Sequence, residues 1–202
     1  MYQKFGKRVF DIALLIALTP AALPLLLAAA VAVRMGLGRP VLFRQKRVGA
    51  NERMFTLYKF RTLTPAPGGD PRAVSDAERL TRLGHFLRST SMDELPQLWN
   101  ILRGDMSFVG PRPLLDIYVP RYTPRQRMRH SVPQGITGWS QVVGRNAVTW
   151  NERFEQDLWY VANRGFWLDC KIILMTFRKV IVRDGVNKPG QATFEEFLGT
   201  ST

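Results

Sequence analysis

The sequence is poor in the residues that form disulfides or bind soft metals. It contains 1 cysteine, Cys170, and 2 histidines among 202 residues. A single cysteine excludes an internal disulfide and is typical of a protein that faces the reducing cytoplasm. So few cysteines and histidines also argue against a zinc site. Any bound metal is therefore expected to be a hard cation with oxygen ligands, such as Mg²⁺.

Acidic residues are also scarce: there are 16 Asp and Glu against 29 Lys and Arg, which gives a net charge of +13. Such an excess of basic residues predicts a polyanionic partner, namely nucleic acid, anionic lipid or a phosphorylated substrate. The sequence contains neither GxxxxGK[ST] nor GxGxxG, so the common nucleotide-binding loops are not expected. No internal repeat is present, and the length suits one domain with a hydrophobic core.

One segment, Ile12 to Val33, carries no charge at all. As a straight helix its 22 residues would measure about 33 Å, which is enough to cross the hydrocarbon core of a bilayer. Basic residues flank it on both sides, although in a spanning helix they mark the cytoplasmic side. Pro20 and Pro24 each remove a helical hydrogen bond near its middle. These features favour a re-entrant helix that breaks at Leu23 and Pro24, with an ordinary kinked transmembrane anchor as the alternative.

Two stretches, Val41 to Lys46 and Met54 to Arg61, alternate apolar and polar residues around a Gly-Ala-Asn-Glu turn. This pattern predicts a β-hairpin. Its cations are expected to form a row on one face that could meet phosphates, and a solvated sheet face is the alternative. They are Arg44, Lys46, Lys59 and Arg61.

Three further stretches, 76–88, 150–163 and 166–182, have the periodicity of amphipathic helices. The last is rich in aromatic and aliphatic residues, which suits a helix at a membrane interface or a core helix. The sequence therefore predicts an α+β, mainly helical fold. Residues 1–38 would form a membrane-associated helix-break-helix. Residues 39–202 would form a compact cytosolic domain, partly embedded in the membrane interface, with interfacial helices and a small β-hairpin.

An acidic pair, Asp93 and Glu94, begins a predicted amphipathic helix over 93–103, which ends at Gly104. Either Ser91 forms a capping box with Glu94, or Asp93 is itself the N-cap. In both cases the carboxylates lie at the positive end of a helix dipole. They point to different sides of the helix, so we expect them to have different environments. On local evidence alone, capping the helix is the favoured role of the pair.

Basic residues surround this pair in the sequence. Arg112 lies between prolines in Gly110-Pro111-Arg112-Pro113, which fixes the backbone on both sides of a guanidinium suited to phosphate oxygens. Arg88 lies five residues before Asp93 and could bind an anion delivered there, with surface solvation as the alternative. Another basic stretch follows Thr123-Pro124 and is expected to face lipid headgroups or solvent. It contains Arg125, Arg127, Arg129 and His130.

At this point the chain resembles the small monotopic phosphoglycosyl transferases of bacteria, the PglC-type members of the bacterial sugar transferase family. The resemblance covers nearly the whole chain and is carried by four blocks, which are Lys59-Phe60-Arg61-Thr62, Ser91-Met92-Asp93-Glu94-Leu95-Pro96-Gln97, Gly104-Asp105-Met106-Ser107-Phe108-Val109-Gly110-Pro111-Arg112-Pro113 and Gly135-Ile136-Thr137-Gly138. It also implies a re-entrant helix. In the family the break follows a serine, whereas this chain has Leu23 before Pro24.

The resemblance implies a Mg²⁺-dependent enzyme of the EC 2.7.8 type. Such an enzyme moves a sugar-1-phosphate from a UDP-sugar to a polyprenol (undecaprenyl) phosphate and releases UMP, as the first membrane step of glycoconjugate or polysaccharide assembly. It implies a ping-pong mechanism with a covalent phosphosugar intermediate on Asp93. Glu94 would assist metal binding or proton transfer, so both carboxylates are expected metal ligands. The helix dipole is expected to keep Asp93 ionised. The expected phosphate-binding cations are Lys59, Arg88, Arg112 and Arg145.

The resemblance places the enzyme on the cytoplasmic face of the bacterial inner membrane, with downstream glycosyltransferases as further partners. Two other classes of protein are alternatives, and the first is suggested by the net charge alone. A membrane-tethered nucleic-acid-binding module is disfavoured, because this sequence lacks a basic stripe interleaved with exposed aromatic residues. A structural scaffold would leave the acidic pair without a role. The stretch Gly190-Gln191-Ala192-Thr193 resembles members that use N-acetylated amino sugars.

Overall fold

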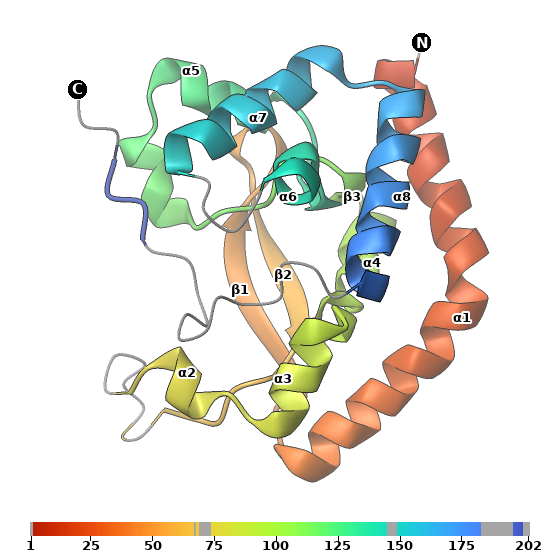
Figure 1. Cartoon of the computed structure of the whole chain (residues 1–202), viewed down its shortest axis with the longest axis vertical. Coiled ribbons are helices and arrows are strands. Elements are labelled where there is room, and N and C mark those ends of the chain that lie inside the picture. The colour runs from red at the N-terminus through yellow and green to blue at the C-terminus, as the bar shows by residue number, and fades with distance from the viewer. Residues whose placement is uncertain (1, 67, 69–73, 145–148, 183–195, 200–202) are drawn as a thin grey trace.

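The computed structural model describes residues 2–66, 68, 74–144, 149–182 and 196–199. Arg145 and the stretch Gly190-Gln191-Ala192-Thr193 lie outside these residues. Within them the chain is mostly helical with two small sheets, in agreement with the predicted fold class (Figure 1).

A single helix, α1 (Lys7–Gly36), follows a π-helical turn, η1 (Tyr2–Gly6), and contains both Pro20 and Pro24. It curves along one edge of the molecule (Figure 1). Its length and hydropathy are sufficient to cross a membrane. The expected interruption at Leu23 and Pro24 is not confirmed, because the chain stays helical through both residues. Thr19 donates a hydrogen bond to the carbonyl of Leu15, four residues before it.

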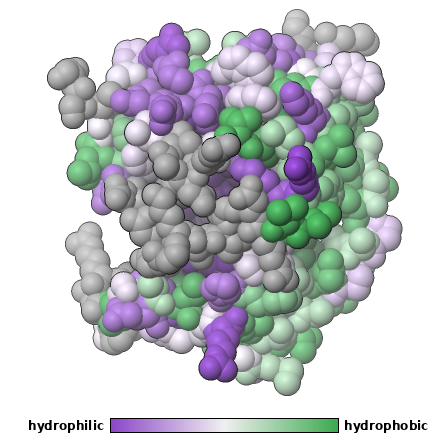
Figure 2. Space-filling view, viewed as in Figure 1, coloured by the Kyte–Doolittle hydropathy of each residue, from purple (hydrophilic) through white to green (hydrophobic). Residues whose placement is uncertain are grey.

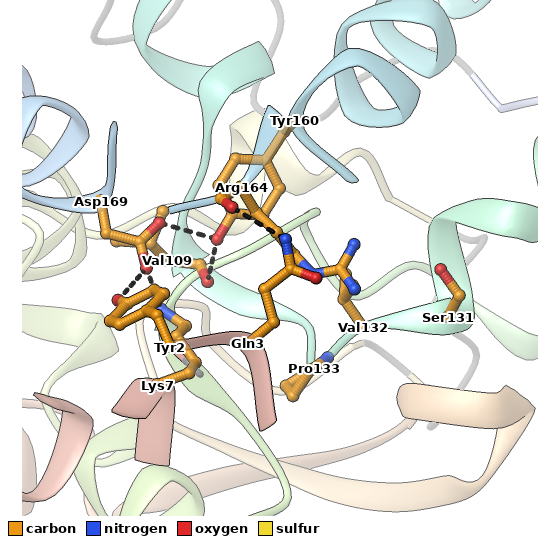
Figure 3. Close-up of a pocket in the computed structure, with 10 residues that line it drawn as sticks. All are labelled: Tyr2, Gln3, Lys7, Val109, Ser131, Val132, Pro133, Tyr160, Arg164 and Asp169. Carbon is orange, nitrogen blue, oxygen red and sulfur yellow. Dashed lines mark hydrogen bonds and ion pairs between the residues drawn. The ribbon is translucent and has the colours of Figure 1, made fainter. Parts of the chain in front are cut away.

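The first turns of α1 are held by a buried carboxylate of the domain. Asp169 of α8 (Phe166–Val182) accepts hydrogen bonds from Tyr2 (2.6 Å), Lys7 (2.7 Å) and Tyr160 (2.8 Å). Figure 3 shows these three side chains directed at Asp169. One turn further along, Asp11 accepts a hydrogen bond of 2.9 Å from the hydroxyl of Ser107.

The last turns of α1 contact the same domain. Ala29 and Val33 are buried against Phe60 and Leu87. Arg61 donates hydrogen bonds to the backbone carbonyls that follow the helix, at Leu37 and Arg39. Both ends of the apolar helix are therefore held by one body of protein.

The predicted hairpin is confirmed: β1 (Leu42–Val48) and β2 (Met54–Phe60) pair antiparallel around the 3₁₀ turn η2 (Ala50–Glu52). Its register places Phe43 opposite Lys59 and Arg44 opposite Tyr58. Directly opposed residues share a face and successive residues alternate between faces. Lys59 therefore lies on the other face from Arg44 and Lys46, and the prediction of one cationic row was wrong.

A second sheet was not predicted. The strands β3 (Ser107–Val109) and β4 (Gly135–Thr137) pair parallel. The two chains approach closely next to these strands. A Cβ atom on Gly110 would lie 2.3 Å from the carbonyl oxygen of Pro133, which leaves no space for a side chain. This sheet brings the Pro-Arg-Pro turn beside the Gly-Ile-Thr-Gly block.

The helix predicted over 76–88 is two helices, α2 (Asp76–Arg79) and α3 (Arg82–Ser89). The interruption has a local cause, because Leu80 pairs as a β-bridge with Leu63 and Thr81 caps α3. The remaining short elements are the 3₁₀ helices η5 (Asp116–Arg121) and η6 (Met128–Ser131) and the helices α5 (Pro124–Arg127) and α6 (Trp139–Val143).

The helix α7 (Trp150–Asn163) and α8 have the predicted bounds. One side of α8 is buried at Asp169 and Ile172, and the other exposes large apolar residues. The exposed fractions of Trp167, Leu174 and Ile181 are 81%, 70% and 79%. These three residues recur every seven positions and form one stripe. Figure 2 shows the hydrophobic surface gathered on the side where α1 and α8 lie, which favours the interpretation of α8 as an interfacial helix.

Candidate active site

The acidic pair lies in a 3₁₀ turn, η4 (Met92–Glu94), and α4 (Gln97–Arg103) begins after it. Ser91 adopts a left-handed backbone conformation with φ of 56° and its side chain forms no cap. The N-cap of α4 is Pro96. Both predicted capping arrangements were therefore wrong, and the pair precedes the helix instead of forming its first turn.

The two carboxylates have different partners, as predicted. Oε1 of Glu94 accepts hydrogen bonds from Nζ of Lys59 (2.5 Å) and Nη2 of Arg112 (2.8 Å). Nζ of Lys59 lies 3.9 Å from Oδ2 of Asp93, which is too long for a hydrogen bond. No other described residue donates to the Asp93 carboxylate, although its side chain is only 11% exposed. Glu94 is thus fixed by two cations, while Asp93 keeps its oxygen atoms uncommitted.

These environments move the two pKa values in opposite directions. Burial and the adjacent charge of Glu94 raise the pKa of Asp93 to about 6, against the opposing charges of Lys59, Arg112 and Arg88. Burial acts on Glu94 too, but the charges and hydrogen bonds of Arg112 and Lys59 outweigh it and hold its pKa well below the usual range. The predicted stabilisation of ionised Asp93 by a helix dipole is therefore wrong in direction. At neutral pH Asp93 is still mostly ionised.

Three of the predicted cations converge on this pair from separate elements. Lys59 is near the end of β2, Arg88 is near the end of α3, and Arg112 follows β3. Nε of Arg88 donates a hydrogen bond of 3.1 Å to Thr62, and its charge reaches Asp93. Arg145, the fourth predicted cation, lies outside the described residues.

Asn100 is a positioning residue that the sequence analysis missed. It is fully buried in α4, where Nδ2 donates to the carbonyl of Thr56 (2.7 Å) and Oδ1 accepts from the amide of Tyr58 (3.2 Å). These bonds join α4 to the backbone of β2 just before Lys59, and so hold Lys59 close to Glu94. Its place on the polar side of the predicted helix did not indicate that it would be buried, because such positions usually face solvent.

Arg129 was also misinterpreted. It was expected to face headgroups or solvent, but it is fully buried, and its Nε and Nη2 atoms lie 3.1 and 2.8 Å from Oδ2 of Asp157. The neighbouring His130 is buried as well, whereas Arg125 and Arg127 are exposed as expected.

The carboxylates can accommodate a Mg²⁺ ion only with help from a substrate. The described residues contain no group of three or more His, Cys, Asp or Glu side chains able to hold a metal. Mg²⁺ is often bound by one or two carboxylates together with substrate phosphates and water. Among the described residues, Asp93 accepts no side-chain hydrogen bond and Glu94 accepts them only at Oε1, so this pair fits such a mode.

Comparison with known proteins gives consistent results. Residues 2–183 match the family described as bacterial sugar transferase. The chain is 47% identical over 194 residues to the uncharacterized sugar transferase EpsL of Bacillus subtilis, covering 96% of each protein. It is 38% identical over 188 residues to the UDP-glucose:undecaprenyl-phosphate glucose-1-phosphate transferase of Caulobacter vibrioides, covering 88% of this chain and 70% of that protein.

A third relative is longer. The undecaprenyl-phosphate galactose phosphotransferase of Salmonella typhimurium is 38% identical over 200 residues, which cover 91% of this chain but 42% of that protein. The chain therefore spans nearly the whole of EpsL and less than half of the Salmonella protein.

Proposed function

The chain belongs to the bacterial sugar transferase family, and on that premise we propose that it transfers a sugar-1-phosphate from a UDP-sugar to undecaprenyl phosphate and releases UMP. The observation that carries the proposal is the inequality of the acidic pair. Glu94 is held by Lys59 and Arg112, whereas Asp93 is buried among cations without a hydrogen-bond donor among the described residues. A carboxylate in that state is suited to act as a nucleophile.

In the first step an oxygen of Asp93 attacks the β-phosphorus of the UDP-sugar. A bond forms between that oxygen and phosphorus, the bond from phosphorus to the bridging oxygen breaks, and UMP leaves with the electron pair. Arg88, Arg112 and Lys59 offset the negative charge of the diphosphate. When held between Asp93, Glu94 and the substrate phosphates, Mg²⁺ would supply further charge neutralisation.

In the second step an oxygen of the polyprenol phosphate attacks the same phosphorus. The bond to Asp93 breaks, its carboxylate is restored, and the product is a polyprenyl diphosphate sugar. Glu94 has a lowered pKa, so it is a weak base at neutral pH. Its role in both steps is to hold Lys59 and Arg112 in place, and metal binding is compatible with that role.

The contacts of α1 with the domain bear on its arrangement in a membrane. We propose that α1 is re-entrant, with both of its ends on the same side of a bilayer, and the contacts of both ends with one domain support this proposal. Basic residues at both ends then face the cytoplasm. The exposed apolar stripe of α8 would rest in the same leaflet, which carries the lipid phosphate. The product would pass to downstream glycosyltransferases.

The covalent step is tested with a UDP-sugar that is labelled in its β-phosphate. A panel of UDP-sugars is first screened for UMP release, where we expect N-acetylated amino sugars to be preferred. Label should then remain on wild-type protein and on Asp116→Asn, a control at an exposed aspartate, but not on Asp93→Asn. Label retained by Asp93→Asn would contradict the assignment of the nucleophile.

A further inference from the structure

The Pro-Arg-Pro turn is held by its backbone carbonyl groups. Its prolines have no N–H to donate. The carbonyl of Pro111 accepts from the amide of Gly135 (3.0 Å), and that of Pro113 from Nη1 of Arg47 (3.4 Å). Between them, the carbonyl of Arg112 accepts a bond of 2.7 Å from Nη2 of Arg129. The only side chain among the described residues that bonds to the Arg112 backbone is therefore Arg129.

Arg129 belongs to a buried network that connects three elements. Its guanidinium, on η6, pairs with Oδ2 of Asp157 on α7, and Oδ1 of Asp157 accepts a bond of 2.7 Å from Ser140 on α6. Arg129 and Asp157 are 0% and 2% exposed. A buried ion pair is weak evidence for a contribution to stability, because desolvation offsets much of the attraction. The network therefore requires another explanation.

The hydrogen bonds of Arg129 explain why the network is present. Nη2 of Arg129 donates to Asp157 and to the Arg112 carbonyl, so Asp157 fixes the guanidinium that fixes the turn. From this turn the Arg112 side chain reaches Glu94. We propose that Arg129, oriented by Asp157, is a positioning residue for the sugar-phosphate transfer, and that it sets the backbone from which Arg112 engages Glu94 and the substrate diphosphate.

The inference rests on the proposed function. It gives Arg129 no direct contact with the substrate. Arg129 has no exposed surface, so a substrate cannot touch it. Because its side chain bonds to the Arg112 carbonyl, we expect its replacement to affect the chemistry through Arg112. A displacement of Arg112 would change the charges around Glu94, where the titratable groups are Lys59, Arg112 and Asp93.

The test compares the double variant Arg129→Met/Asp157→Leu with a matched control, Arg125→Met/Glu155→Leu. The control removes a second bidentate pair, joining α5 to α7 at the surface, where the two side chains are 69% and 58% exposed. For the buried variant we expect kcat/KM for covalent labelling to fall roughly ten- to hundred-fold, the scale typical of lost orienting partners. The acid limb of its pH profile should move to higher pH, because a displaced Arg112 stabilises the ionised carboxylates less. The control should keep both values.

Thermal unfolding shows whether each variant is folded. A folded buried variant with wild-type kcat/KM and an unmoved acid limb would overturn the proposal. If that variant does not fold, Arg129→Lys takes its place, because a point charge cannot keep the forked contacts of a guanidinium. It should show a smaller loss with the acid limb moved in the same direction, and wild-type behaviour would again overturn the proposal. Failure of wild-type protein to label would instead count against the proposed function.

Discussion

Arg112 and Glu94 are joined by a hydrogen bond of 2.8 Å between Nη2 and Oε1, across 18 positions of the sequence. Glu94 thus accepts from Arg112 and from Lys59 at the same oxygen, whereas no described residue donates a hydrogen bond to the carboxylate of Asp93. The chemical difference between two adjacent carboxylates therefore depends on residues distant in the chain.

The rate of covalent labelling should depend on the ionisation of Asp93. Its pKa of about 6 means that the nucleophile is ionised above pH 7 and is progressively protonated below pH 6. We expect kcat/KM to be constant from pH 7 to 8 and to fall about tenfold per pH unit well below 6. Initial labelling rates between pH 5 and 8 measure this. In Glu94→Gln the fall of kcat/KM should begin at a lower pH, since the charge of Glu94 helps to raise the pKa of Asp93.

Removal of the Asp93 charge should stabilise the protein. The pKa of this group rises from 3.8 in the unfolded chain to about 6 in the folded protein, so the folded state binds more protons and the ionised carboxylate costs stability. Asp93→Asn should gain on the order of 2 kcal/mol above pH 6, with the gain declining towards pH 4. Thermal unfolding at pH 7.5 and pH 5 measures it. Asp116→Asn should change little, and a destabilised Asp93→Asn at pH 7.5 would be inconsistent with this account.

The contact between β3 and β4 should not tolerate a methyl group. A Cβ atom at Gly110 would lie 2.3 Å from the Pro133 carbonyl oxygen and 2.9 Å from the Gly135 amide, both of which are backbone atoms. Gly110→Ala should therefore cost more than about 3 kcal/mol of stability or prevent folding. Gly165→Ala is the control, because its nearest neighbour is 4.0 Å away. Chemical denaturation of both variants provides the comparison, and equal stabilities would show that the two strands can separate without cost.

The course of α1 through the membrane can be tested with a thiol reagent that does not cross membranes. Cys170, the only cysteine, is first replaced by serine, and Phe5→Cys is introduced at an exposed position just before the apolar run. We expect no modification from the periplasmic side, because a re-entrant helix does not emerge there. Arg125→Cys, exposed on the domain, should react only after the membrane is opened. A helix that spans the membrane from a cytoplasmic domain would place position 5 in the periplasm, so modification of that position from the periplasm would contradict re-entry.

Local sequence patterns were sufficient for several elements. The bounds of α7 and α8 and the hairpin around Gly49 depend mainly on neighbouring residues, and these predictions agree with the structure. The uncharged run that becomes α1 was equally clear. Helical periodicity and turn residues determine such features without reference to the rest of the fold.

The candidate site depends both on local sequence patterns and on tertiary packing. The sequence identified Asp93, Glu94 and three of the cations that surround them, and it predicted that the two carboxylates would differ. It did not predict that Glu94 would bind the cations, because Lys59 lies 35 positions away. It also misjudged Arg129, whose burial depends on α6 and α7. Tertiary packing decided the pKa values of the pair, because burial and distant charges, which no local pattern contains, determine them.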